Sequence, residues 1–107
     1  MPRYLWQISY TTTGAKGLLS EGGTARRDAI TAMVESVGGH VEACYYAFGA
    51  TDLYVIGELP DEVAAASLSL RTAVAGGARS QTVVLLTPEQ IDEAAHREVS
   101  YSPPGEG

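Results

Sequence analysis

The sequence has little of what metal, redox and nucleic-acid chemistry requires. It contains one cysteine, Cys44, and two histidines, His40 and His96, so an internal disulfide is excluded and a structural zinc site is not expected. Only 7 residues are Lys or Arg against 13 Asp or Glu, a net charge of −6 that argues against nucleic acids and anionic membrane surfaces. The HExxH, CxxC, GxSxG and GxGxxG motifs are also missing. We therefore expect no metal and no cofactor.

Long apolar runs are missing too. No stretch approaches the ~20 residues of a membrane span, and the amino terminus lacks the basic-then-apolar pattern of a signal peptide. Together with the single thiol, this predicts a soluble cytoplasmic protein. The 107 residues, of which 45% are hydrophobic, are enough for one small domain, which we place at residues 1–98. The segment 99–107, with two prolines and two glycines, is expected to be a flexible tail.

Hydrophobic spacing divides the chain into alternating strands and helices. An apolar residue at every second position, or a short apolar run, predicts strands over 3–10, 40–48, 52–59 and 79–86. Helical spacing predicts one helix capped by Thr24 and a second that begins near Pro60, each ended by a glycine pair. A short third helix is predicted after Thr87. Residues 11–23, with three threonines and four glycines, predict a loop with at most one turn.

The element order is strand, helix, strand, strand, helix, strand, followed by the short helix. This order is typical of an α+β, ferredoxin-like βαββαβ sandwich, in which two helices cover one face of a four-stranded antiparallel sheet. Right-handed crossovers place the first and third strands in the centre. The other face then has no cover, and Tyr46, Phe48 and Ile56 would form a large exposed apolar patch there. The sequence therefore predicts a homodimer, or a higher oligomer, whose sheets face each other or close into a joint barrel.

Several separated motifs occur in one order along the chain. They are Ser9-Tyr10-Thr11, Gly14, Lys16-Gly17, Glu21-Gly22-Gly23, Arg26-Arg27, Gly38-Gly39 and Phe48-Gly49-Ala50-Thr51-Asp52-Leu53. As far as about Arg97, the sequence resembles the GYD-domain family. The resemblance implies a ferredoxin-like fold that is distantly similar to dimeric α+β barrel proteins, among them cofactor-free monooxygenases, lactone isomerases, cyclases and binding modules. The namesake motif is Gly, any residue, Tyr, Asp; here Gly49 and Asp52 match, and Thr51 replaces the tyrosine.

Four side chains are candidates for proton transfer in an active site: His40, Asp52, Tyr46 and Tyr10. A two-residue period puts His40, Glu42, Cys44, Tyr46 and Phe48 on one face of the second predicted strand. An imidazole, a carboxylate and a phenol in line supply an acid and a base near neutral pH. The alternative for His40 is a solvated position at the strand start. The alternative for Asp52 is a carboxylate that fixes the turn through backbone N–H groups.

Five further residues are candidates for ligand binding: Gln7, Ser9, Trp6, Lys16 and Tyr54. Gln7 and Ser9 are polar groups on the predicted open face, where they need a ligand, a water or a hydrogen bond across a dimer seam. Lys16 lies in a glycine-rich segment that precedes a helix, an arrangement that holds anions but that equally suits a solvated side chain. Trp6 and Tyr54 line a pocket for a planar compound, or else belong to the core.

Three functions are compatible with these features. The first is a homodimeric small-molecule-binding domain whose pocket, on the open sheet face, takes an apolar or aromatic metabolite. The second is a cofactor-independent isomerase, cyclase or monooxygenase acting on such a metabolite, with the proton-transfer candidates in its active site. The third is a non-catalytic assembly module whose acidic surface serves solubility.

Overall fold

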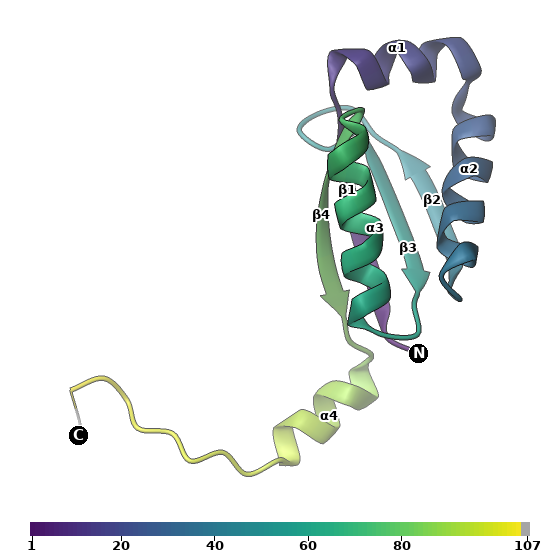
Figure 1. The fold of residues 1–107 in the computed structure, drawn as a ribbon. Helices are drawn as coiled ribbons and strands as arrows, with labels where there is room; N and C mark the ends of the chain where they lie inside the picture. Colours follow the sequence, from purple (N-terminus) through teal and green to yellow (C-terminus); the bar gives the residue numbers. More distant parts are fainter. Residues whose placement is uncertain (106–107) are drawn as a thin grey trace.

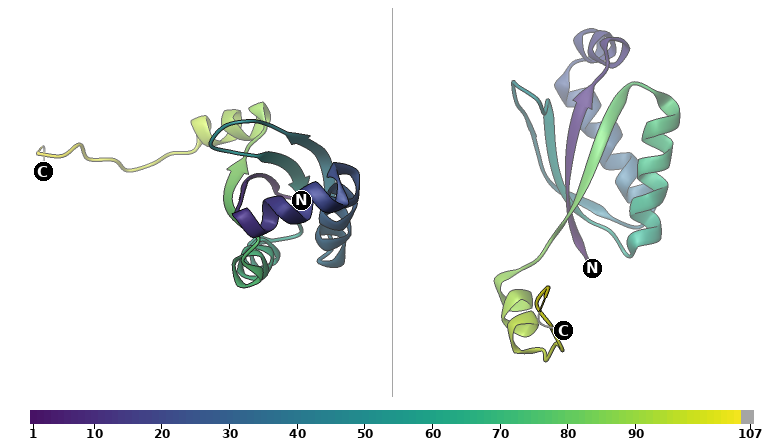
Figure 2. Two further views of the ribbon diagram at one scale, coloured as in Figure 1. Left: turned by 90° about the horizontal axis from the view of Figure 1, so that it is seen from above. Right: turned by 90° about the vertical axis from the view of Figure 1, so that its left-hand side faces the viewer.

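The computed structural model describes residues 1–105 and has the α+β, ferredoxin-like fold that the sequence predicts (Figure 1). Its elements are β1 (Arg3–Tyr10), α1 (Thr12–Glu21), α2 (Gly23–Ser36), β2 (His40–Tyr46), β3 (Leu53–Glu58), α3 (Glu62–Ala75), β4 (Ala78–Leu85) and α4 (Pro88–His96). The four strands form one antiparallel sheet in the order β2-β3-β1-β4, so β1 and β3 are central, as expected. Helices α2 and α3 cover one face of this sheet (Figure 2).

The core lies between the sheet and these two helices, because β1 keeps the alternation expected from the sequence. Tyr4 and Trp6 point beneath the helices and are each 5% exposed. Their rings stack with centroids 6.0 Å apart. The other buried side chains come from β3, α2, α3 and the segment after β3: Leu53, Val55, Leu59, Ile30, Val34, Ala64, Ala65 and Leu68. Each element therefore contributes its apolar side to a single cluster.

Residues 12–21, which the sequence predicts as a loop, form the helix α1, so that prediction is wrong. Thr11 begins the helix: its hydroxyl accepts a hydrogen bond from the Gly14 amide at 3.2 Å. Gly14 packs directly on the Gly77 carbonyl, at a distance that leaves no room for a Cβ. Gly14 thus serves a close backbone contact, a tertiary requirement that local helix propensity does not register. The predicted cap of the next helix is also wrong, because Gly22, with φ +87°, precedes α2 in place of Thr24.

Strand β2 carries a bulge that reverses its alternation. Val41 lies opposite Gly57 and Ala43 lies opposite Ile56, so two positions on β2 correspond to one on β3. The prediction that His40, Glu42, Cys44, Tyr46 and Phe48 share one face is therefore wrong. His40 and Glu42 remain on the uncovered side of the sheet, whereas Cys44 packs against the core and Tyr46 contacts α2. Phe48 lies beyond the strand end and is fully exposed.

Within the described residues, nothing covers the sheet face away from α2 and α3. We call it the open face. An ion-pair cluster of Arg3, His40, Glu42 and Glu58 lies at one end of it. Its other residues come from all four strands and are Leu5, Gln7, Ser9, Ala43, Tyr45, Tyr54, Ile56, Arg79, Gln81, Val83 and Leu85. The sequence places Tyr46 and Phe48 in this patch, and the bulge puts Tyr45 there instead, beside Tyr54 and Ile56 of β3. Tyr45 is 73% exposed. An apolar strip therefore runs across the middle of an uncovered sheet.

Helix α4 extends away from the domain (Figures 1 and 2). The Cα radius of gyration is 17.2 Å, compared with about 13 Å for a compact chain of this length. The described part of the tail, residues 99–105, contains no helix or strand, and the remainder of the predicted tail, residues 106–107, lies outside the described residues. Over the part of the chain that the structure describes, no helix combines the length and the apolar character needed to cross a membrane.

The contact between α1 and β4 predicts opposite effects for two neighbouring glycines. Gly14→Ala forces a methyl group into the Gly77 carbonyl, so we expect it to lower the free energy of unfolding by about 2 kcal/mol. Gly17→Ala is the matched control. Nothing lies within 4 Å of the place that its methyl group would occupy, and alanine favours the helix by about 0.5–1 kcal/mol. Urea unfolding of both variants measures the difference, and equal stabilities would contradict the contact.

Candidate functional site

A cavity of about 310 Å³ lies beneath α1, on the helix side of the sheet. Its apolar lining comes from β1, α1, α2, α3 and the start of β4: Ile8, Leu18, Ile30, Met33, Ala75 and Ala78. The cavity exists because α1 bridges the end of the helix layer, where α2 and α3 leave the sheet uncovered (Figure 1). Its size and lining are those of a small-molecule pocket.

Few polar groups reach this cavity. Arg26 and Glu21 meet across the α1–α2 junction, with Nη1 and Oε1 3.6 Å apart. Arg71 enters the lining from α3. These three charged side chains, together with Thr72 and the phenol of Tyr10, give an apolar cavity a small number of polar contact points.

Tyr10 has the most unusual environment of these residues. It ends β1, points to the helix side and lines the cavity. Its hydroxyl is buried and, within residues 1–105, has no hydrogen-bond partner. Burial, reinforced by the neighbouring Tyr46, raises the pKa of Tyr10 to about 12. At neutral pH the residue is therefore an uncharged donor, and its hydroxyl interacts with that of Tyr46 without meeting the full geometry of a hydrogen bond.

A second hollow, of about 630 Å³, adjoins the first and shares Tyr10 with it. Three of the four proton-transfer candidates meet here: Tyr10, Tyr46 and Asp52. Tyr46 donates its hydroxyl to the Gly23 carbonyl at 3.1 Å, which joins β2 to the start of α2. Burial raises the pKa of Tyr46 as well. Both phenols are therefore protonated at neutral pH.

Asp52 has a structural partner in this hollow. Its Oδ2 accepts the backbone N–H of Tyr10 at 2.8 Å, and its own carbonyl accepts from Ala47 at 2.9 Å. The carboxylate thus connects the end of β1 to the turn that precedes β3. This is the turn-fixing arrangement named above as the alternative to catalysis.

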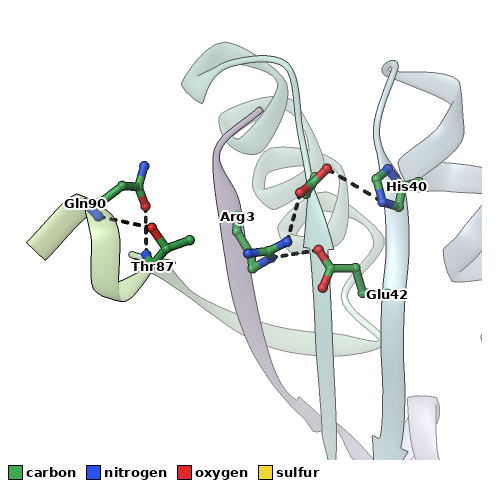
Figure 3. A network of polar contacts seen from close by, with 6 residues as sticks. Arg3, His40, Glu42, Thr87 and Gln90 are labelled. Atoms are coloured by element: carbon green, nitrogen blue, oxygen red, sulfur yellow. Dashed lines mark hydrogen bonds and ion pairs between the residues drawn. The ribbon is translucent and has the colours of Figure 1, made fainter.

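His40, the fourth proton-transfer candidate, lies at the opposite end of the sheet (Figure 3). Its side chain is 55% exposed, and its Nε2 lies 3.6 Å from Glu58. Seven residues of β1 separate this end from Tyr10, a distance of roughly 23 Å. The structure therefore does not bring His40 together with the other three candidates.

His40, Glu42 and Glu58 also have the spacing of metal ligands, with ligand atoms within 4.8 Å of one another. Arg3 already contacts both carboxylates, at 2.7 Å to Glu42 and 3.0 Å to Glu58 (Figure 3). The pKa of the Arg3 guanidinium is raised by its hydrogen bond to Glu42. Because a guanidinium neutralises the two carboxylates, this cluster is an ion-pair network that joins β1, β2 and β3.

The predicted ligand-binding residues lie apart from both cavities. Gln7, Ser9 and Tyr54 are on the open face, where Ser9 donates to the Ala50 carbonyl at 2.7 Å. Trp6 is in the core, and Lys16 is exposed on α1. The sequence places the pocket on the open face, whereas these two cavities lie at the helix side and at the end of the sheet.

Sequence reasoning missed the residues that enclose the cavity, chiefly Leu18, Met33 and Arg71. Leu18 is the one with a usable signal, because two adjacent leucines in a glycine-rich segment are unusual for a solvated loop. Met33 has the spacing of an ordinary core position of a helix, and nothing local distinguishes Arg71 from a solvated arginine.

Comparison with known proteins gives one match. A family model described as the GYD domain matches residues 4–95, which is most of the chain. Neither the curated proteins nor the solved structures gave a match to this chain.

The environment of Tyr10 predicts a loss of stability in alkali. Its folded pKa of about 12 exceeds the unfolded value near 10, so the unfolded state binds fewer protons between these pH values. The free energy of unfolding should therefore fall as pH rises through this window. We expect roughly 1 kcal/mol from Tyr10, about half of the full effect of two pKa units because the residue is partly exposed.

Denaturant unfolding at pH 9 to 12, with wild type and Tyr10→Phe compared at each pH, measures this effect. The variant should lose less stability than wild type over the window, and Tyr101→Phe, in the exposed tail, should behave as wild type. Parallel curves for wild type and Tyr10→Phe would show that the phenol is not buried.

Proposed function

We propose that this chain, which belongs to the GYD-domain family, is a homodimeric small-molecule-binding domain whose pocket is the cavity beneath α1. One observation carries the proposal: Tyr10 lines this cavity, and within the described residues its buried hydroxyl makes no hydrogen bond of full geometry, only a weaker interaction with Tyr46. A ligand with a hydrogen-bond acceptor would satisfy that donor. The predominantly apolar lining favours an apolar or aromatic body for the rest of the ligand.

The protonation states support binding more strongly than acid–base catalysis. A phenol with a pKa of about 12 donates a hydrogen bond at neutral pH and does not act as a base. The Asp52 carboxylate is held by the Tyr10 backbone amide, and His40 lies at the other end of the sheet. The groups that a cofactor-independent isomerase or cyclase would need are therefore not assembled around one point.

Helix α1, which covers the cavity, is attached to the domain mainly at its two ends. None of its residues is buried, and its amino-terminal end is held by Thr11, whose amide donates to Gly77 at 3.1 Å. The other end passes through Gly22 and Gly23, and the Tyr46 hydroxyl bonds there to Gly23. A roof fixed at one end and weakly held at the other allows a ligand to enter without unfolding of the core.

The open face supports the dimeric part of the proposal. Its central strip carries Tyr45, Tyr54 and Ile56, and no helix of this chain covers it. Contiguous apolar patches of this kind mark interaction surfaces in soluble proteins. A second copy with the same patch covers both faces at once and closes by two-fold symmetry.

A pair of aromatic probes tests the pocket. 2-Acetylnaphthalene carries a carbonyl acceptor, and 2-ethylnaphthalene has nearly the same shape without one. Wild type should bind the ketone about three- to tenfold more tightly, the value of one hydrogen bond to a buried donor. Tyr10→Phe should remove this preference and leave the affinity for 2-ethylnaphthalene unchanged.

Isothermal titration calorimetry gives the four dissociation constants. Tyr46→Phe is the matched control, because its hydroxyl is satisfied by Gly23, and it should keep the preference for the ketone. Failure of both probes to saturate wild type, or an equal preference in wild type and Tyr10→Phe, would contradict the proposed pocket.

Two exposed tyrosines test the dimer. Tyr45 on the open face is 73% exposed and Tyr101 in the tail is 74% exposed, so a lysine at either position meets the same solvent in a monomer. Sedimentation velocity at micromolar concentration should give a dimer for wild type and for Tyr101→Lys. Tyr45→Lys should shift the protein toward monomer, because two copies of the charge enter the interface. A monomeric wild type would refute the dimer.

A further inference from the structure

Helix α4 is a well-defined helix, yet within residues 1–105 all of its side chains stay exposed. It has a complete capping box: Thr87 accepts from the Gln90 amide at 3.1 Å, and Gln90 returns a bond to the Thr87 amide at 2.8 Å (Figure 3). Pro88 occupies its first turn. A nine-residue helix is too short to be stable alone in water, so these start signals imply a surface that α4 packs against.

The residues of α4 divide cleanly into two sides. Ile91, Ala94 and Ala95 follow the i, i+3, i+4 spacing and form an apolar side. The acidic residues occupy the opposite side: Glu89, Asp92 and Glu93. Ile91 is 53% exposed. The helix therefore carries a ready apolar side for docking and a charged side suited to solvent.

The junction with β4 directs α4 away from its own domain. Two residues, Leu86 and Thr87, separate the end of β4 from the helix. Thr87 is extended, with φ −74° and ψ 160°, as a residue before proline prefers, and the capping box holds this conformation. With Thr87 held in this conformation, α4 leaves the end of β4 without turning back onto the sheet (Figure 1). This direction favours a surface on another molecule.

We propose that α4 packs across the open face of a second copy of this chain, and that the two copies exchange this helix reciprocally. The inference rests on the proposed homodimer and names the element that holds it together. One chain contains both an uncovered apolar sheet face and an unpacked amphipathic helix, and a two-fold exchange satisfies both without leaving either exposed. Such an exchange is a common route to symmetric dimers.

The size of the open face supports the exchange. Four strands about 4.8 Å apart and six to eight residues long give a flat area of roughly 450 Å². Standard interfaces bury about 800 Å² on each partner, so the open face alone is small for a stable dimer. Helix α4, about 13 Å long and about 10 Å wide, enlarges the surface that each copy contributes.

Paramagnetic NMR in mixed dimers separates exchange from folding back. Both copies carry Cys44→Ala. One copy contains no ¹⁵N and bears a nitroxide attached at Glu93→Cys, and the other copy is labelled with ¹⁵N and bears no nitroxide. We expect broadening of open-face amides, those of Tyr54 and Val83 among them, in the ¹⁵N copy. Helix-face amides, such as that of Val34, should remain sharp and serve as the internal control.

Three other results of this experiment would each contradict the inference, and they can be told apart. Broadening that occurs only when the nitroxide and ¹⁵N are in the same chain would show that α4 folds back on its own sheet. A dimer without broadening of the open face would refute the docking of α4 while leaving the proposed homodimer intact. A monomer in the Cys44→Ala background and in wild type would refute both, and the probe titrations above would still decide the pocket independently.

Two adjacent substitutions to the same residue measure what α4 contributes. Ile91→Asn places an amide on the apolar side of the helix, and Asp92→Asn is the matched control on the polar side. Because each dimer contains two helices, Ile91→Asn should raise the dimer dissociation constant by about a hundredfold, and Asp92→Asn by less than about threefold. Circular dichroism checks that both variants keep the fold of the domain. Equal dissociation constants for the two variants would contradict the exchange.

Discussion

The contact of two backbones, Gly14 in α1 with Gly77 before β4, determines the shape of the binding end of this protein. The approach is so close that neither a side chain nor water fits between them, and the Thr11 amide and hydroxyl bond to the Gly76 and Gly77 carbonyls beside it. This contact fixes where α1 starts. The direction of α1 across the end of the helix layer then defines the cavity, places Leu18 in its roof and encloses the Tyr10 hydroxyl.

The sequence predicts the elements whose pattern is local. In β1 the large apolar residues recur at every second position, and the helices after Pro60 and Thr87 start beside their capping residues. The fold class follows from this spacing, and the strand order follows from it together with the right-handed crossover rule. The sequence does not predict α1 or the bulge in β2. Gly14 of α1 makes a contact 63 residues away in sequence, and the bulge adds one residue to β2 without any glycine or proline in that strand to mark it.

In the candidate site, too, local features can be predicted from the sequence and features that depend on tertiary contacts cannot. Tyr10 and Tyr46 can be named from the sequence as proton-transfer candidates, but five of the six tyrosines lie on strands, and spacing alone does not show which of them line a cavity. The cavity cannot be predicted, since it requires a roof whose composition is that of a loop, and Arg71 enters its lining only through the position of α3. His40 is a case in which the sequence pattern groups residues that the fold separates. Period-two spacing groups it with Tyr46, and one extra residue at the bulge sends the two side chains to opposite faces.

The bulge in β2 also affects how sheets of neighbouring molecules can meet. β2 and β4 are the two edges of the sheet, and an exposed edge offers unpaired backbone groups to any other strand. On β2 the pairing is interrupted at Glu42, whose carboxylate is drawn inward to Arg3, so an incoming strand meets a twisted and charged edge. β4 is paired with β1 without interruption through eight residues and keeps a regular outer edge. Unwanted strand addition, and with it aggregation, therefore has one side of this sheet available to it and not the other.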